Sequence, residues 1–147
     1  MSDKAALVVH FPVDRHVYKY LQKKVGEKLV VSKNNFFGSM VLDILQKNYS
    51  DLERVPSEMV FPVEVSIRYM EKMGFYLDSR SIRKFNTRID DVFREEMVGA
   101  ISLNFEKFRI PKERSLRELL DFYNITEEDI KFETLVRDFK RKIKAVG

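Results

Sequence analysis

The chain has 147 residues, of which 44% are hydrophobic, and its 27 basic and 23 acidic side chains give a formal net charge of +4. This length suits one ordinary domain with a core, and the twelve phenylalanines exclude a disordered, charge-rich tail protein. The absence of cysteine excludes a disulfide framework and a thiolate metal site. The sequence shows neither a signal-peptide core nor an apolar run that could span a membrane, so we expect a cytoplasmic protein.

The chain is expected to begin with a strand followed by a helix. Residues 5–11 are apolar and β-branched in the centre, which predicts a short strand. We expect Pro12 to end it, because proline has no amide hydrogen with which to continue a ladder. A helix should then run from an N-cap at Asp14 to a stop at Gly26, with apolar residues at spacings of three and four.

A second helix is predicted after a brief extended segment at residues 29–31. Ser32 is its expected N-cap, and an apolar face carries the helix to about Lys47. Residues 48–59 contain turn-forming side chains and little periodicity, so we interpret them as a connection.

The centre of the chain predicts a β-hairpin and then a long helix. Apolar and polar residues alternate from residue 63 to residue 70, as in a half-buried strand. Residues 71–73 would form the turn and residues 74–77 the returning strand. From Ser79 a helix with a continuous apolar stripe should extend toward Pro111.

The last part of the chain predicts two amphipathic helices that meet at a tight turn. The first is expected over residues 116–123, with Asn124 in the left-handed C-terminal position and Ile125 folding back onto the helix. Thr126, with Asp129 three residues later, resembles a capping box that would open the second helix. Carboxylates crowd the start of this second helix, so insertion into a DNA groove is not expected of it.

Together these elements predict a mainly helical α+β fold. It would contain an N-terminal strand with two helices, a central β-hairpin, and a C-terminal helical half with a helix-turn-helix-like turn. We expect a single domain over residues 1–147, with a subdivision into residues 1–58 and 59–147 as the alternative.

Three polar clusters are candidates for contact with nucleic acid. The first lies at the start of the second helix, where amide groups and a lysine suit a phosphate or an adenine edge, unless they only cap the helix. The second is a basic stripe on the long helix, which carboxylates further along could neutralise. The third lies in the last eleven residues, which carry five basic side chains against one acidic, although cations at a helix C-terminus also complement its dipole. The expected contacts are Lys33, Asn34, Asn35, Arg80, Arg83, Lys84, Arg88, Arg137, Lys140, Arg141, Lys142 and Lys144.

No catalytic or metal site is expected. His10 and His16 lack the spacing of a zinc-binding pair, and no cysteine supports them. Asp91 and Glu95 lie one helical turn apart and could share a divalent cation, but no second acidic cluster is committed to the same place. Serine nucleophile elbows, P-loops and dinucleotide-binding glycine patterns do not occur, so we predict neither an enzyme nor a cofactor.

Two stretches of the chain resemble small uncharacterised proteins carried by bacterial phages and mobile elements. They are residues 13–47, VDRHVYKYLQKKVGEKLVVSKNNFFGSMVLDILQK, and residues 116–142, LRELLDFYNITEEDIKFETLVRDFKRK. The resemblance touches about half of the chain. It implies a mobile-element setting, in which nucleic-acid handling is common, and it supplies no site residues.

The sequence therefore favours a non-enzymatic nucleic-acid-binding protein, for DNA rather than RNA, that contacts phosphates through basic helical clusters. The alternative is a protein-interaction or assembly module. In that case an exposed Phe- and Met-rich surface would form a homo-oligomer or bind a phage or host protein.

Overall fold

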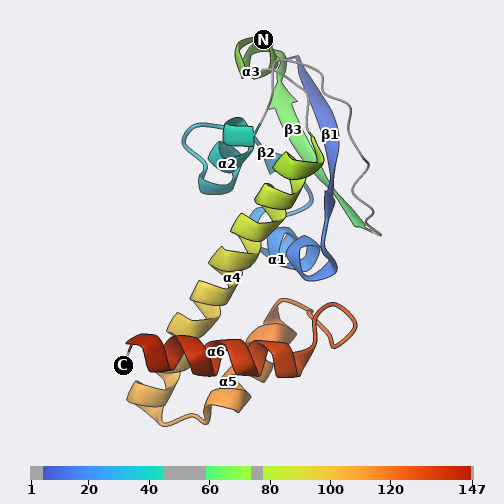
Figure 1. The fold of residues 1–147 in the computed structure, drawn as a ribbon. Coiled ribbons are helices and arrows are strands. Elements are labelled where there is room, and N and C mark those ends of the chain that lie inside the picture. The colour runs from blue at the N-terminus through green and yellow to red at the C-terminus, as the bar shows by residue number, and fades with distance from the viewer. Residues whose placement is uncertain (1–4, 45–58, 74–77, 147) are drawn as a thin grey trace. The chain divides into compact units, whose positions relative to one another are not determined.

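The computed structural model describes residues 5–44, 59–73 and 78–146, and shows the mainly helical α+β fold that the sequence predicts (Figure 1). The elements in chain order are β1 (Ala6–Val13), α1 (Arg15–Val25), β2 (Leu29–Val30), α2 (Phe36–Ile44), β3 (Met59–Ser66), α3 (Ile67–Met73), α4 (Ser79–Phe108), α5 (Lys112–Phe122) and α6 (Phe132–Val146).

The chain divides into two compact units, which we call unit 1 (Met1–Arg88) and unit 2 (Ile89–Gly147). The division falls inside α4, which contributes its first turns to unit 1 and the remainder to unit 2. A subdivision between residues 58 and 59 would instead separate β3 from β1, the strand with which it pairs along its whole length.

Unit 1 contains a three-stranded sheet in the order β1-β3-β2, with β1 antiparallel and β2 parallel to β3. The prediction that Pro12 ends the first strand is wrong, because β1 continues through Pro12 to Val13. The carbonyl oxygen of Pro12 accepts a hydrogen bond from Nδ2 of Asn86, so the backbone of Pro12 faces away from β3. Proline is tolerated there because the missing amide costs no ladder bond on the open side of an edge strand.

The predicted hairpin is also wrong. The alternation over Phe61, Val63 and Val65 does mark a strand with one buried face, but its antiparallel partner is β1. Residues 67–73 form α3 rather than strand and turn, and the hydroxyl of Ser66 accepts the amide hydrogen of Tyr69 (3.2 Å) at the start of this helix. The expected return strand, residues 74–77, lies outside the described residues.

The two N-terminal helices follow their predicted order, with one change at the start of the second. Helix α1 lies between Asp14 and Gly26, whose φ of 87° is the conformation expected of a glycine stop. Helix α2 begins at Phe36, because Oδ1 of Asn35 accepts the amide hydrogen of Gly38 (3.0 Å) and so caps the helix. The predicted cap, Ser32, instead accepts the amide of Asn34 (3.2 Å) in the preceding turn.

The core of unit 1 forms where α1 and the first turns of α4 pack against the sheet. The ring of Phe11 on β1 meets that of Phe85 on α4 edge to face, with centroids 5.3 Å apart. Asn86 links the same elements, since it accepts a hydrogen bond from the Asp14 amide (2.9 Å) and donates to the Pro12 carbonyl (3.0 Å). This buried amide side chain therefore fixes the β1–α1 junction against α4.

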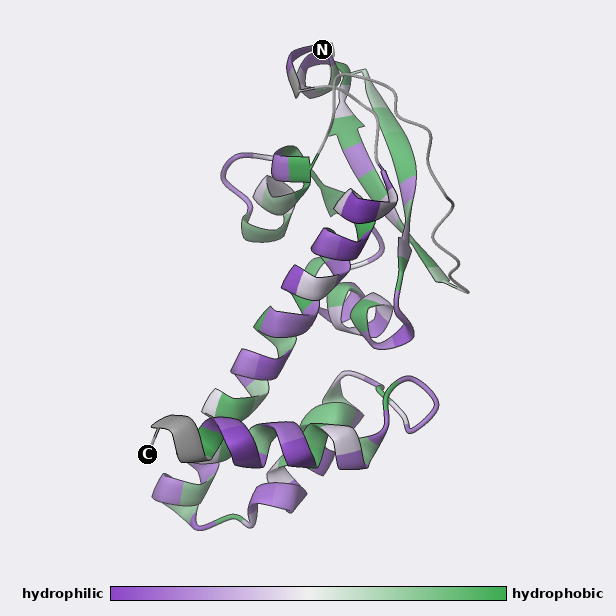
Figure 2. Cartoon of the chain, viewed as in Figure 1, coloured by the Kyte–Doolittle hydropathy of each residue, from purple (hydrophilic) through white to green (hydrophobic). Residues whose placement is uncertain are grey.

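Unit 2 is a bundle of the second part of α4 with α5 and α6. Its core is formed by Phe93, Met97, Ile101, Leu116, Leu120, Leu135 and Phe139, which are less than a tenth exposed. Figure 2 shows hydrophobic and hydrophilic residues alternating along α6, the pattern of a helix with one buried face.

The connection between α5 and α6 confirms one prediction and corrects another. Asn124 has a φ of 59°, and the amide of Ile125 returns to the carbonyl of Leu120 (2.9 Å), as expected for a left-handed helix end. The side chain of Asp129 accepts the amide hydrogen of Thr126 (2.8 Å), but this bond closes a single turn and α6 begins only at Phe132. The connection is therefore longer than the tight turn that the sequence predicts.

Candidate nucleic-acid interface

The first predicted cluster lies at the start of α2, and its polar groups serve the helix itself. The side chain of Asn35 is engaged as the cap, whereas Lys33 and Asn34 are exposed. A Cβ added at Gly38 would lie 2.8 Å from the backbone nitrogen of Ser32, so the glycine allows the first turn of α2 to pack against the preceding loop. The geometry at this cluster matches helix capping and leaves Lys33 as its one exposed cation.

The second cluster forms a cationic face on α4, which we define as Arg80, Arg83 and Lys84. All three side chains are exposed. Their spacing places them opposite Ile82 and Phe85, which are buried against the sheet. Within the described part of the chain, Arg83 and Lys84 have no ion-pair partner.

Arg88, the fourth predicted residue of this cluster, is committed to a carboxylate. Its Nη1 lies 3.4 Å from Oδ2 of Asp43 on α2. Of the carboxylates further along α4 that could have neutralised the face, Asp90 lies 2.9 Å from Nε of Arg94. The cationic face therefore keeps its charge, whereas Arg88 at its edge is partly neutralised.

The start of α4 already has its own stabilising negative charge. Oδ1 of Asp78 accepts the amide hydrogen of Ser81 (2.6 Å), and this hydrogen bond, assisted by the charge of Arg80, holds the pKa of Asp78 below its usual value. A carboxylate at a helix N-terminus interacts favourably with the dipole, whereas cations in the same turns interact unfavourably. The stability of α4 therefore does not account for the cationic face.

The third cluster, near the C-terminal end of α6, is organised around Asp138, whose side chain is only 12% exposed. The carboxylate of Asp138 lies 3.3 Å from Nη1 of Arg94, 3.4 Å from Nη2 of Arg141 and 3.4 Å from Nζ of Lys142. Burial lowers the pKa of Arg94, but Asp90 and Asp138 outweigh this effect and the pKa is raised. Arg94 therefore remains a cation at the centre of an ion-pair network.

This network reduces the charge that the third cluster can offer to a ligand. Arg141 and Lys142 share Asp138, and Nζ of Lys140 lies 4.0 Å from Oε1 of Glu113. Arg137 is exposed and has no ion-pair partner among the described residues. The side chain of Lys144 lies outside the described part of the structure.

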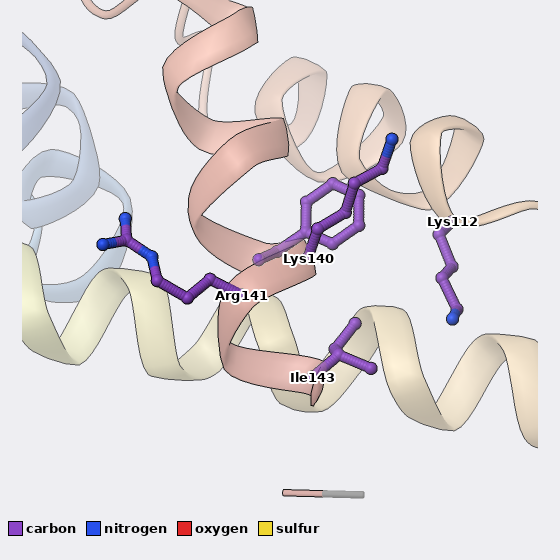
Figure 3. A pocket seen from close by; sticks show the side chains of 5 residues that line it. Lys112, Lys140, Arg141 and Ile143 are labelled. Atoms are coloured by element: carbon purple, nitrogen blue, oxygen red, sulfur yellow. The ribbon is translucent and has the colours of Figure 1, made fainter. Parts of the chain in front are cut away.

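A pocket of about 560 Å³ opens beside this cluster, between the first residue of α5 and the last turns of α6 (Figure 3). Phe139 and Ile143 provide its apolar lining, and Lys112, Lys140 and Arg141 provide three cations. Figure 3 shows the three charged side chains extending in different directions around Ile143 and the phenylalanine ring. We call this cavity the α5–α6 pocket.

Lys112 was not among the residues predicted from the sequence to form this cluster. The available signal was the density of basic residues between α4 and α5, where Lys107, Arg109, Lys112 and Arg114 fall within eight positions. In the structure, Nζ of Lys112 lies 4.7 Å from the ring centroid of Phe105, and the guanidinium carbon of Arg109 lies 5.5 Å from the same centroid. This aromatic ring is 37% exposed, so cations and accessible π-surface occur together beside the pocket.

A second cavity, of about 790 Å³, lies in unit 1 at the carboxyl ends of the parallel strands β2 and β3. Its lining includes Ser32, Ser66, Arg68 and Tyr69. The described residues contain no group of three or more side chains of the metal-ligating types His, Cys, Asp and Glu. None of the described helices combines the length and the apolar character that a membrane crossing needs.

The net positive charge of the chain lies in unit 1 when the charges of the two compact units are counted separately. Unit 1 contains 15 basic and 10 acidic residues, a net charge of +5, whereas unit 2 contains 12 basic and 13 acidic residues, a net charge of −1. The excess that the sequence shows in its last eleven residues is therefore offset within unit 2 by the carboxylates of α4, α5 and the α5–α6 connection.

Comparisons with protein-family models, with curated proteins and with solved structures found no match to this chain. The resemblance to phage and mobile-element proteins stays a prediction.

Proposed function

We propose that this chain is a non-enzymatic nucleic-acid-binding protein that contacts phosphates of duplex DNA through the cationic face of α4. The observation that carries the proposal is that Arg83 and Lys84 are exposed and have no ion-pair partner among the described residues, on a helix whose N-terminus disfavours cations. Positive charge that does not serve the fold is available to an external anion.

The dimensions of the cationic face suit a polyanion. Helical rise of about 1.5 Å per residue separates Arg80 and Lys84 by about 6 Å along the axis. One strand of duplex DNA carries a phosphate about every 3.4 Å along its axis, so this length spans about two phosphate intervals and reaches about three phosphates. The net charge of +5 on unit 1 adds long-range attraction to these local contacts.

A salt series with labelled duplex DNA tests the proposal. Each phosphate contact contributes about 0.9 to the slope of log K against log salt, so replacing Arg80, Arg83 and Lys84 together by glutamine should reduce the slope by about 2.7. The control is the triple variant Lys23→Gln, Lys24→Gln, Lys28→Gln, which removes the same formal charge from exposed positions of unit 1 outside α4, including Lys28, which Glu64 already pairs. It should retain most of the slope.

Two results would refute this proposal. One is a wild-type chain that does not bind duplex DNA at 50 mM salt, and the other is an equal loss of slope in both triple variants. A matched duplex RNA, measured in the same series, tests the expectation that DNA is preferred.

The exposed phenylalanines support a second candidate function, a protein-interaction or assembly module. Phe36, Phe108 and Phe122 are 60%, 67% and 56% exposed, whereas Met70 and Met97 are buried. The exposed apolar side chains are therefore phenylalanine, leucine and valine, and neither of these methionines is among them. Light scattering across the same salt series measures the mass in solution, and a salt-insensitive oligomer without nucleic-acid affinity would favour this function.

A further inference from the structure

We infer that the open edge of the sheet in unit 1 binds a second copy of this chain, with the β1 strands of the two copies paired antiparallel about a two-fold axis at Val8. This pairing would join the two three-stranded sheets into one. The inference goes beyond duplex binding and does not rest on it, because it concerns the backbone of β1 and not the cationic face of α4. It gives the second candidate function a surface and a partner.

The outer side of β1 presents backbone hydrogen-bonding groups. The strand order β1-β3-β2 leaves β1 at one edge of the sheet (Figure 1). The carbonyl of Ala5 accepts the amide hydrogen of Ile67 (2.9 Å) on the β3 side, whereas the carbonyl of Pro12 points away from β3. Backbone groups alternate in direction along a strand, so the outward-facing positions are also Ala6, Val8 and His10. Within residues 5–44, 59–73 and 78–146, these three positions have no backbone partner on that side.

Most of this edge lacks the features that usually keep a free strand from pairing. Edge strands are commonly protected by charged side chains, by proline or by a bulge. Residues 5–13 contain no Lys, Arg, Asp or Glu, in a chain of which 34% of the residues are charged. The register with β3 is continuous from Ala6 to Val13, so β1 contains no bulge. Pro12 protects only the far end, and residues 6–10 are left able to pair with another strand.

The composition of β1 suits pairing with a copy of itself. Like charges directly opposite one another destabilise a strand pair, and an uncharged strand avoids this when it faces its own copy. Val8 is 49% exposed and would face Val8 of the second copy across the axis. The small side chain of Ala6 would lie opposite the larger one of His10, and the same contact would recur on the other side of the axis.

Pro12 determines the register. With the axis at Val8, Ala6 pairs with His10 of the second copy, and Pro12 lies opposite residue 4, which precedes β1. Moving the axis by one residue toward Pro12 would place this proline opposite Ala6, although it has no amide hydrogen and Asn86 already binds its carbonyl. Moving the axis the other way would leave fewer residues paired.

The assembly closes at two copies. The opposite edge of the sheet is formed by β2, which has only two residues and is too short to extend the sheet further. Residues 6–10 span about 17 Å of strand, which gives an interface of the small class, below about 1,200 Å². We therefore expect a reversible dimer with a dissociation constant of about 10–100 μM.

Sedimentation equilibrium over protein concentrations from about 1 μM to about 1 mM tests the dimer. Val8→Lys would place two ammonium groups opposite each other at the axis and should raise the dissociation constant at least about tenfold. The matched control is Val30→Lys, since Val30 is 45% exposed and pairs with Glu64 on β3, as Val8 does from the other side. This control carries the same change on the same face at the opposite edge, and its dissociation constant should stay within about twofold of the wild type.

A cross-linking measurement tests the register without the lysine variants. The chain has no cysteine, so one introduced thiol reports on one position. Directly opposed residues of a hydrogen-bonded antiparallel pair have Cα atoms about 5.5 Å apart, within the range of a disulfide. Under mild oxidation Val8→Cys should form a covalent dimer, and Val30→Cys should do so at least about tenfold more slowly.

Salt distinguishes this inference from the proposed function. Backbone hydrogen bonds and apolar contacts hold the dimer, so raising the salt from about 50 mM to about 500 mM should leave it intact while duplex binding weakens. A wild type that remains monomeric at about 1 mM refutes the inference and leaves duplex binding standing. Equal effects of the two lysine variants, equal cross-linking of the two cysteine variants, or growth beyond two copies also contradict it. A dimer that binds no duplex would support this inference and refute the duplex proposal.

Discussion

Replacing Asn86 by alanine tests the junction that holds β1 and α1 against α4. The side chain of Asn86 makes three hydrogen bonds, accepting from the Asp14 amide (2.9 Å) and donating to the carbonyls of Pro12 and Ile82 (3.0 Å each). In the variant the backbone groups of Asp14 and Pro12 lose this partner, while the carbonyl of Ile82 keeps its bond within the helix.

The magnitude follows from those two groups. An unsatisfied buried polar group costs about 1–3 kcal/mol, and the higher helix propensity of alanine returns about 0.5 kcal/mol. The two groups together would cost about 2–6 kcal/mol if fully buried, but both hydrogen bonds are only partly buried, so we expect the free energy of unfolding to fall by an amount near the lower end, about 2–3 kcal/mol. In urea, with a slope of about 2 kcal/mol per molar, the midpoint should fall by about 1–1.5 M.

The assay is urea unfolding followed by circular dichroism, combined with amide hydrogen exchange. Exchange at Asp14 should accelerate in the variant, because its amide loses the Asn86 acceptor. The control is Thr87→Ala at the exposed neighbouring position, which should change stability by less than about 0.5 kcal/mol. If Asn86→Ala is no more destabilising than this control, the proposed role of the junction is refuted.

Two further predictions concern the helix starts and the glycines. Gly38→Ala should lower the free energy of unfolding by about 1–3 kcal/mol, because the new Cβ would lie 2.8 Å from the Ser32 nitrogen. Gly99→Ala should raise the free energy of unfolding by about 0.5–1 kcal/mol, because the new Cβ meets nothing within 4 Å and alanine favours the helix. Thermal unfolding of both variants checks this contrast. The Ser81 hydrogen bond lowers the pKa of Asp78, so ionised Asp78 contributes stability above its usual pKa of 3.8 that is lost as pH falls through the lower folded value. Asp78→Asn should therefore be less stable than the wild type at neutral pH, with a difference that narrows below about pH 4, and a pH-independent difference in urea midpoints would contradict this assignment.

Local periodicity predicted the elements whose partners lie close in sequence. The stripe from Ile82 to Ile101 marks the buried face of α4, and Asn124 takes the left-handed conformation predicted for it. The pairing of β3 with β1 was not predictable in this way, because a period of two describes a strand with one buried face whatever its partner. The prediction that Pro12 ends the strand was wrong for a related reason. The missing amide hydrogen of proline costs a ladder hydrogen bond only on the side of β1 that faces a neighbouring strand.

Charge clusters were visible in the sequence, but their availability was not. The sequence predicts Arg141 and Lys142 as cations available to a ligand. In the structure both lie beside the largely buried carboxylate of Asp138, which also contacts Arg94. The place of Lys112 in a pocket was not predictable from its neighbours in sequence, because the other lining residues belong to α6, about 30 positions later in the chain. The pairs of Asp138 with Arg141 and Lys142 join residues three and four positions apart on α6, a spacing that the sequence shows. The pairs of Arg88 with Asp43 and of Lys140 with Glu113 join different helices, so spacing along one helix could not predict them.

Net charge along the sequence and the ion pairs of the structure favour different segments as candidates for a duplex contact. The last eleven residues concentrate positive charge, yet their own Asp138 pairs with Arg141 and Lys142, and Glu113 of α5 pairs with Lys140. The first turns of α4 lie within residues 1–136, which carry 22 basic and 22 acidic side chains and are therefore neutral as a whole. Arg83 and Lys84 nevertheless have no carboxylate partner among the described residues. Because counterions are released only from charges that protein carboxylates have not already paired, the cationic face of α4 should contribute more to the salt dependence of duplex binding than the C-terminal cluster does.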